Sequence, residues 1–404
     1  MKSNNKYISY GHQHIDADDI SAVVDVLKSD WLTTGPKTKA FEAMLCELTN
    51  AKFAISCSSG TAALHLSMLA AGIGEGDAVI VPSITFASTA NAVRFVGAEV
   101  IFSDVDSETG LISDECMLKA LNVSHKSSKI KAVIPVHLNG QSIDYEKICH
   151  LANDNDLMII EDASHAIGAN YLTGNKKITI GSCDYSAMTN FSFHPVKTIT
   201  AGEGGAITTN SNELAQRLSR FRNHSIVKSE DLFVNKQLSK DEQGAINPWY
   251  YEIQELGYNY RLSDIHSALA LSQLNKLSKF IEKRRFLVNK YDEYFKETSS
   301  LIHPIAKIKK CEPAWHLYVV HIDFESLGIE RSTVINHLAE EGIGSQVHYI
   351  PLHWQPYYKN RYGKINLVGA ESYYSKCLSL PLQFSMQEKD VVFIVEKLVN
   401  ILQK

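Results

Sequence analysis

The sequence predicts an α/β protein in which helices flank a mostly parallel sheet, followed by a smaller α+β domain. Between residues 59 and 210, short β-branched runs alternate with helical stretches, as expected of a parallel sheet. A long helical stretch over 263–295 then leads into a shorter mixed region. We therefore expect a large domain over 1–280, whose N-terminal segment could join the small domain, and a small C-terminal domain over 281–404.

The elements of the large domain follow from local patterns. An amphipathic segment over 16–29 comes first, and a helix begins at Ser59, where Ser-Gly-Thr opens an Ala/Leu-rich stretch. A Gly-Asp turn leads into the apolar run 78–81, which Pro82 closes and which we expect to be a strand. The remaining expected elements are a helix over 89–97 and strands over 100–102, 130–136, 157–160 and 205–209.

The stretch over 263–295 is expected to be one long helix that bridges the two domains, because its apolar residues recur at helical spacing. These residues are Ile265, Leu269, Leu274, Leu277 and Ile281. The small domain should then contain a strand over 316–322, a helix over 331–341 and a terminal helix from 387 onward.

Composition excludes several classes of protein. The net charge is −5, so no basic field is present to attract nucleic acid. The seven cysteines include no CxxC pair, and the sixteen histidines show no metal-ligand spacing, which argues against disulfide frameworks and metal sites. The N-terminus lacks an apolar signal segment, and no apolar run is long enough to span a bilayer. We expect a cytoplasmic protein with no membrane, nucleic-acid or metal partner.

Functional candidates lie where the expected strands end, since ligands of such sheets bind beyond the carboxyl ends of the strands. Ser59, Gly60 and Thr61 open a helix, whose free N–H groups and positive dipole end attract a phosphate. Ordinary helix capping is the alternative interpretation. Phe86 follows another strand and could stack on a planar ring, although a core phenylalanine is the commoner explanation.

Asp162 and Lys197 carry the strongest chemical signals. Asp162 directly follows an apolar run, and a carboxylate there needs a cationic partner such as a protonated pyridine nitrogen. A structural ion pair, or the cap of a helix starting at residue 163, remains an alternative. Lys197 follows His-Pro-Val and precedes a Gly-rich stretch, and a partly desolvated lysine in such a place can form a Schiff base. The alternative is a lysine that merely solvates the surface.

Taken in order, these features resemble the fold-type-I pyridoxal-phosphate enzymes. More narrowly, the chain is similar over nearly its full length to the nucleotide-sugar aminotransferases of the DegT/DnrJ/EryC1/StrS family. Further matching segments are Glu161–Ala166, Leu256–Asp264 and Leu378–Pro381. The resemblance implies that pyridoxal 5'-phosphate is the cofactor.

The resemblance also implies a role for each matching residue. Lys197 would hold the cofactor covalently and shuttle a proton, and Asp162 would pair with the ring nitrogen. Phe86 would cover one ring face, and His165, where the family often has Gln, would lie near the phenolic oxygen. Ser59, Gly60, Thr61 and Ser192 would hold the phosphate. Asn259 would reach that phosphate from a second subunit, which implies a homodimer with shared active sites.

Within the family, segments 32–36 and 346–358 resemble the transaminases of the pseudaminic acid pathway. This implies L-glutamate as the amino donor and a UDP-linked 4-keto-6-deoxy-N-acetylhexosamine as the acceptor, namely UDP-2-acetamido-2,6-dideoxy-β-L-arabino-hex-4-ulose. His348, Tyr349 and His353 would belong to the substrate site, or would pack at a domain interface without touching ligand. The chain departs from the family pattern at Ala201, where Thr is usual, and at Asn139, where Tyr is common.

Three other functions are considered. The enzyme could act on another nucleotide-linked 4-keto sugar, of the perosamine or bacillosamine type. Sugar-dehydrating relatives have histidine in place of the reactive lysine, so Lys197 argues against that activity. A silent, regulatory protein on the same scaffold is disfavoured by the pair of Asp162 and Lys197. The polar stretch over 225–249 could face the substrate or be a surface insertion.

Overall fold

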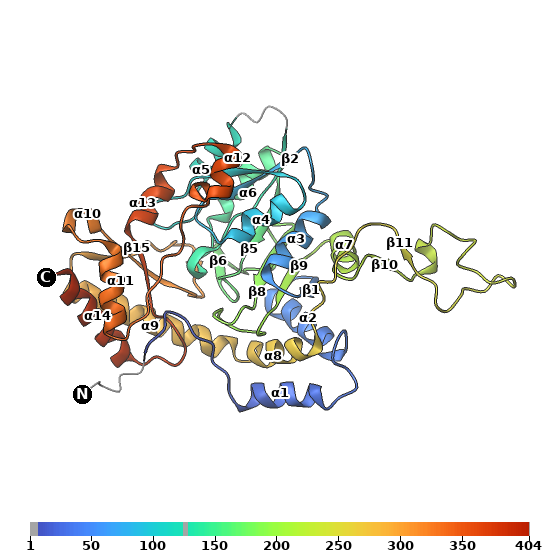
Figure 1. Cartoon of the computed structure of the whole chain (residues 1–404), viewed down its shortest axis with the longest axis horizontal. Helices are drawn as coiled ribbons and strands as arrows, with labels where there is room; N and C mark the ends of the chain where they lie inside the picture. The colour runs from blue at the N-terminus through green and yellow to red at the C-terminus, as the bar shows by residue number, and fades with distance from the viewer. Residues whose placement is uncertain (1–6, 124–127, 404) are drawn as a thin grey trace.

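A seven-stranded sheet forms the centre of the computed structural model, which describes residues 7–123 and 128–403 (Figure 1). The strand order is β1-β9-β8-β5-β4-β2-β3. The strands are β1 (Phe53–Cys57), β2 (Asp77–Pro82), β3 (Glu99–Ser103), β4 (Lys129–Val133), β5 (Met158–Asp162), β8 (Met188–Ser192) and β9 (Gly205–Thr209). Neighbours from β3 to β8 pair in parallel, whereas β9 is antiparallel to both β1 and β8. The mostly parallel sheet is therefore confirmed.

Helices cover both faces of this sheet because its strands are apolar on both sides. In β2, Ala78 and Ile80 belong to one buried cluster, while Val79 and Val81 belong to the other. The second cluster includes α3 (Gly60–Ala70), α4 (Ala87–Phe95) and α7 (Asn212–Arg222). The first includes α2 (Pro36–Thr49), α5 (Asp114–Leu121) and α6 (Tyr145–Asp154). This layering brings the N-termini of α3 and α4 to the edge where β5 and β8 end.

The single long helix expected over 263–295 is wrong, because the structure has two helices there. These are α8 (Asp264–Leu274) and α9 (Leu277–Thr298), and they meet at Asn275 and Lys276. The Lys276 amine lies 2.7 Å from carboxylate oxygens of both Asp16 and Asp19. That ion pair ties the junction to the N-terminal helix α1 (Ala17–Leu27), which packs along α8 (Figure 1).

The C-terminal region contains a three-stranded antiparallel sheet in the order β12-β14-β15. Its strands are β12 (Ile302–Pro304), β14 (Tyr318–Ile322) and β15 (Cys377–Leu380). The accompanying helices are α10 (Phe324–Leu327), α11 (Arg331–Glu340), α12 (Pro356–Tyr362), α13 (Val368–Lys376) and α14 (Glu388–Leu402). A further small sheet joins β13 (Cys311–Glu312) to β6 (Asn170–Thr173) and β7 (Lys176–Thr179). The proposed boundary at residue 280 stays a prediction, and α9 runs through it.

An arm projects from the body of the molecule (Figure 1, yellow-green). It begins at β10 (Ile226–Val227), returns through β11 (Glu252–Ile253), and includes the polar stretch over 225–249. Of the helices that the structure describes, none is long and apolar enough to cross a membrane. Within residues 7–123 and 128–403, no cluster of three or more His, Cys, Asp or Glu side chains could hold a metal ion.

Candidate active site

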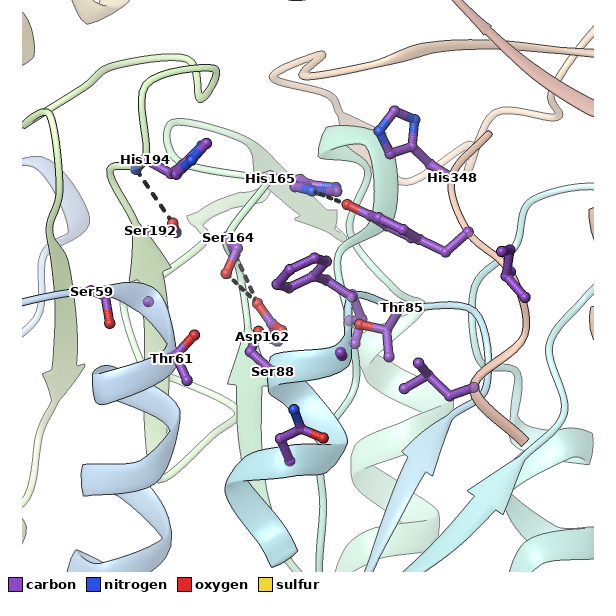
Figure 2. A pocket seen from close by; sticks show the side chains of 18 of the residues that line it. Ser59, Thr61, Thr85, Ser88, Asp162, Ser164, His165, Ser192, His194 and His348 are labelled. Atoms are coloured by element: carbon purple, nitrogen blue, oxygen red, sulfur yellow. Dashed lines mark hydrogen bonds between the residues drawn. The ribbon is translucent and has the colours of Figure 1, made fainter. Parts of the chain in front are cut away.

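A cavity of about 1000 Å³ opens beyond the carboxyl ends of β5 and β8. Ten of the twelve residues that the sequence singled out line its wall. They are Ser59, Gly60, Thr61, Phe86, Asp162, His165, Ser192, Lys197, His348 and Tyr349. Figure 2 shows most of them converging on one hollow from α3, the end of β5 and the 348–349 segment. Asn259 and His353 do not line it.

The start of α3 presents free backbone N–H groups to the cavity. Ser59 caps the helix, because its hydroxyl accepts from the Ala62 N–H at 3.1 Å. The N–H groups of Gly60 and Thr61 belong to the first turn, where a helix offers no internal acceptor. A Cβ on Gly60 would lie 2.7 Å from the Ser192 Cβ, so only glycine lets these two segments approach so closely. This is a concave anion-binding geometry.

Asp162 is buried at the end of β5, and among the described residues the side chain accepts hydrogen bonds from neutral groups only. Ser164 donates to Oδ1 from its backbone N–H at 3.1 Å and from its hydroxyl at 2.6 Å. The Thr89 hydroxyl donates to Oδ2 at 2.8 Å. Its negative charge therefore remains available to a cationic ligand in the cavity. The alternative of a helix cap is wrong, because residues 163–166 form turns and not a helix.

Lys197 extends into the cavity from the loop between β8 and β9. Its backbone N–H donates to the carbonyl oxygen of His194 at 2.9 Å, which fixes the loop around it. Burial lowers the pKa of the Lys197 amine to about 8, and the negative charge of Asp162 partly offsets that lowering. An amine with this pKa is in part neutral, and hence nucleophilic, near pH 7 to 8.

His165 is held as a neutral ring, and its hydrogen bonds determine which ring nitrogen carries the proton. The backbone N–H of Asn139 can only donate, and it points to Nδ1 at 3.3 Å, so Nδ1 is the acceptor. The proton then resides on Nε2, which lies 3.2 Å from the Tyr349 hydroxyl (Figure 2). Burial, together with the positive charge of Lys197, keeps the pKa of His165 well below its usual value. His165 therefore offers the cavity an uncharged N–H donor.

Two further histidines from the C-terminal region complete this wall. Nδ1 of His348 lies 2.8 Å from the Ser379 hydroxyl, and burial lowers the His348 pKa to about 3. His316, which the sequence reading missed, lines the cavity with its ring 4.4 Å from that of His165. Its Nδ1 is buried and has no hydrogen-bond partner among the described residues. Burial also holds the His316 pKa well below its ordinary value.

Phe86 is not a core residue. It precedes the first turn of α4, and 59% of its surface is exposed although it lines a cavity wall. Its ring centroid lies 6.1 Å from that of Tyr349. An apolar ring left uncovered in a cavity provides a face on which a planar ligand can stack.

The remaining two candidates lie elsewhere. His353 is buried, with Nδ1 2.6 Å from the Ser83 hydroxyl and Nε2 3.4 Å from Glu371, and it does not reach the cavity. We therefore leave His353 out of the substrate site proposed below. Asn259 is exposed and bridges to Asn223 at the base of the arm.

A mostly parallel sheet with helices on both faces, a smaller C-terminal unit and this site are the arrangement of the fold-type-I pyridoxal-phosphate enzymes. The chain belongs to the DegT/DnrJ/EryC1/StrS aminotransferase family, whose model matches residues 13–399. It is a pyridoxal-phosphate-dependent aminotransferase.

Individual relatives agree with this assignment. The chain is 38% identical to the UDP-4-amino-4,6-dideoxy-N-acetyl-β-L-altrosamine transaminase of Campylobacter jejuni, covering 98% of each chain. Its fold matches PseC of Helicobacter pylori, an aminotransferase involved in the biosynthesis of pseudaminic acid, with a TM-score of 0.86, 28% identity and coverage of 98% and 100%. It also matches a protein described as a sugar aminotransferase, Spr1654 of Streptococcus pneumoniae in its PLP form, with a TM-score of 0.86, 30% identity and coverage of 98% and 99%.

The residues of the cavity fit this cofactor. The close approach of Gly60 to Ser192 places the first N–H groups of α3 and the Ser192 hydroxyl together on the cavity wall, where a phosphate can bind, and a side chain on Gly60 would push the two segments apart. No cationic group among the described residues hydrogen-bonds to the Asp162 carboxylate, which leaves it to meet a protonated ring nitrogen. Lys197 supplies an amine of lowered pKa in the same cavity.

Proposed function

We propose that this enzyme transfers the amino group of L-glutamate to C4 of a UDP-linked 4-keto-6-deoxy-N-acetylhexosamine, in pseudaminic acid biosynthesis. The observation that carries the proposal is that Lys197 and Asp162 line one cavity of about 1000 Å³, large enough for a cofactor and a nucleotide sugar. The relative from Campylobacter jejuni, at 38% identity over 98% of this chain, supports the choice of acceptor.

The cofactor, when bound, supplies an electrophilic carbon and a ring that withdraws electrons. Lys197 would hold it covalently, and its amine, when free, would move a proton at the donor's Cα. A pKa of about 8 suits that task, because the amine both gains and loses protons near neutral pH. Asp162 would keep the ring nitrogen protonated through its negative charge. His165 would lie near the ring's phenolic oxygen, and Phe86 would cover one ring face.

The test is a two-part assay on purified protein. The first part mixes the cofactor-loaded enzyme with L-glutamate and follows the change in cofactor absorbance and the release of 2-oxoglutarate. The second part supplies a panel of UDP-linked 4-keto sugars and reads the amino-sugar product by mass. We expect preference for the 6-deoxy-β-L-arabino acceptor. If the enzyme prefers a perosamine- or bacillosamine-type acceptor, that sugar is the substrate and the proposed one is wrong. If the enzyme does not react with glutamate, the result supports the silent, regulatory alternative.

We further propose that two copies form a homodimer with shared active sites. Asn259 lies outside the cavity of its own chain, at the base of the arm. The arm and the segment just after β11 expose apolar side chains, with Val234, Trp249 and Leu256 each at least 75% exposed. Exposed apolar surface of this extent is typical of a protein-protein interface. A copy of the chain that packed over the arm would cover it.

Complementation tests this arrangement. The variants Lys197→Ala and Asn259→Asp are each expected to be inactive or nearly so alone, since the new carboxylate would repel the cofactor phosphate. In a dimer with shared sites, each site combines residue 197 of one chain with residue 259 of the other. A mixed dimer therefore has one site that carries both substitutions and one site that carries neither. Recovery of activity on co-expression is therefore expected. If mixed dimers purified by two tags stay inactive while wild-type mixed dimers are active, Asn259 acts in its own chain or not at all.

A further inference from the structure

One face of α4 forms a continuous wall of the cavity. Ser88, Asn91, Arg94 and Phe95 all line the cavity, and their spacing of three to four residues places them along a single side of the helix. The helix starts beside Phe86, and the Thr89 hydroxyl in its first turn donates to Asp162 at 2.8 Å. With a rise of about 1.5 Å per residue, Arg94 lies roughly 12 Å further along the axis than Phe86. The cavity thus extends well beyond the groups that fit the cofactor.

The far end of this wall carries an excess of positive charge. Arg94 Nη1 lies 2.9 Å from a Glu99 oxygen, and Arg361 also binds Glu99, with Nε at 3.0 Å. Two guanidinium groups therefore share one carboxylate, and Nε of Arg94 has no partner among the described residues. The carboxylates that line the cavity, Asp162 and Glu203, belong to β5 and to the loop after Lys197, not to this end.

Aromatic rings border the same end. Phe95 and Tyr357 line the cavity, and each side chain is 55% exposed. Exposure of an aromatic ring to water is unfavourable, so a ligand that covers these rings would be stabilised. Asn91 lies between them and the cofactor end, with its Oδ1 accepting from the Tyr358 hydroxyl at 2.7 Å. A cationic group next to exposed ring faces is the combination that recognises a phosphorylated nucleoside.

We propose that this end of the cavity binds the nucleoside diphosphate part of the acceptor, with Arg94 contacting the diphosphate and Phe95 and Tyr357 flanking the base. The inference rests on the proposed function for the identity of the sugar. The order of groups along α4 matches the order of groups in a nucleotide sugar. The reacting carbon lies at the cofactor, the hexose comes next, and the diphosphate follows at Arg94. The specificity for a nucleotide-linked sugar then originates here, apart from the cofactor-binding residues.

The test measures binding of UDP and of uridine to the cofactor-loaded enzyme by calorimetry. The wild-type enzyme should bind UDP at least about tenfold more tightly than uridine, since charge-assisted contacts to phosphate are strong. Arg94→Gln should remove most of that difference, and should raise the KM for the keto-sugar nucleotide about 10- to 100-fold. Its reaction with L-glutamate, which carries no phosphate, should stay at the wild-type rate.

Two variants control this experiment. Lys397→Gln removes a cation on α14 that pairs with Glu341, outside the cavity, and should leave the UDP-to-uridine ratio unchanged. Tyr357→Ala removes an exposed ring with little loss of core packing, and should weaken UDP and uridine equally. If Arg94→Gln does not fold, the uridine affinity of Tyr357→Ala still tests whether this end of the cavity binds the nucleoside. An unchanged UDP-to-uridine ratio in folded Arg94→Gln, or unchanged uridine affinity in Tyr357→Ala, would overturn the inference. Loss of the glutamate reaction in the wild type would instead overturn the proposed function.

Discussion

Nε2 of His165 lies 3.2 Å from the hydroxyl oxygen of Tyr349, and this contact joins the end of β5 to the C-terminal region across the cavity. The Asn139 N–H on the opposite ring nitrogen leaves Nε2 as the proton-bearing atom. Tyr349 therefore accepts from a neutral histidine, and its own hydroxyl proton remains free to donate into the cavity. Burial raises the Tyr349 pKa far above its usual value, so the hydroxyl stays protonated.

The first prediction concerns replacement of His165. Gln also offers a neutral N–H donor, so His165→Gln should keep activity within about tenfold of wild type. His165→Ala leaves the buried Asn139 N–H without an acceptor and should destabilise the fold by about 1–3 kcal/mol. The folded His165 pKa lies well below that of the unfolded chain. The unfolded state then binds more protons below about pH 6.5, and stability falls there as the pH falls. Denaturant unfolding at several pH values should show this acid sensitivity reduced in His165→Gln.

The second prediction concerns the covalent role of Lys197. Lys197→Ala should abolish the cofactor absorbance band of the loaded enzyme and lower turnover by about 10²–10⁴-fold or more, because no other lysine among the described residues lines the cavity. Reduction with borohydride followed by peptide mass mapping should place the cofactor on residue 197 in the wild type. A labelled peptide elsewhere in the chain, or turnover at the wild-type rate, would refute the assignment.

A third prediction uses the charge of the same lysine in the cofactor-free enzyme. The Lys197 pKa is about 8 when folded, and that of an unfolded lysine is about 10.4. Between these values the unfolded state binds more protons, so stability rises as the pH rises through this window, and the full penalty persists below pH 8. Lys197→Met should therefore stabilise the cofactor-free protein at pH 7. The gain over wild type, measured by thermal unfolding, should shrink by pH 10.

Five of the seven strands of the sheet were expected because they are apolar. Strand β1 was overlooked, although it is apolar too, and β8 could not be predicted. Its sequence contains Thr189 and Asn190, yet both are fully buried. Asn190 is satisfied by tertiary contacts, since it donates to the Glu161 carbonyl at 3.0 Å and accepts from the Ser67 hydroxyl at 2.7 Å. Such long-range hydrogen bonds leave no periodic signal in the sequence. The break between α8 and α9 was missed for a similar reason, because Lys276 is held there by distant carboxylates.

Part of the candidate site could be predicted, because its residues lie in recognisable local sequence patterns. Gly60, Asp162 and Lys197 each occur in a local pattern that has a chemical meaning, and the structure brings them to one cavity. His316 enters that cavity from the other end of the chain with no local signal around it. For His353 the sequence left two alternatives open, and the structure favours the packing one, since His353 hydrogen-bonds with Ser83 and does not line the cavity.

The fourth prediction separates charge from hydrogen bonding at Asp162. Asp162→Asn keeps an acceptor for Ser164 but removes the negative charge, so cofactor affinity and turnover should each fall by about 10- to 100-fold. Thr89→Val removes one donor at 2.8 Å and keeps the charge, and its effect should stay below about tenfold. Cofactor titration and steady-state kinetics measure both. Equal losses in the two variants would indicate that the carboxylate acts through its hydrogen bonds and not its charge.

The last prediction concerns the close approach of Gly60 to Ser192. A Cβ at residue 60 would lie 2.7 Å from the Ser192 Cβ, so Gly60→Ala must push apart the start of α3 and the end of β8. Cofactor binding should weaken by at least about tenfold, because overpacking of this kind shifts backbone at a cost of about 1–3 kcal/mol. Gly74→Ala is the matched control, since its new Cβ would come no closer than 3.7 Å to the Val96 carbonyl oxygen. The double variant Gly60→Ala/Ser192→Gly removes the clash and should bind the cofactor as well as Ser192→Gly alone. A double variant as weak as Gly60→Ala would show that the contact with Ser192 is not what requires glycine.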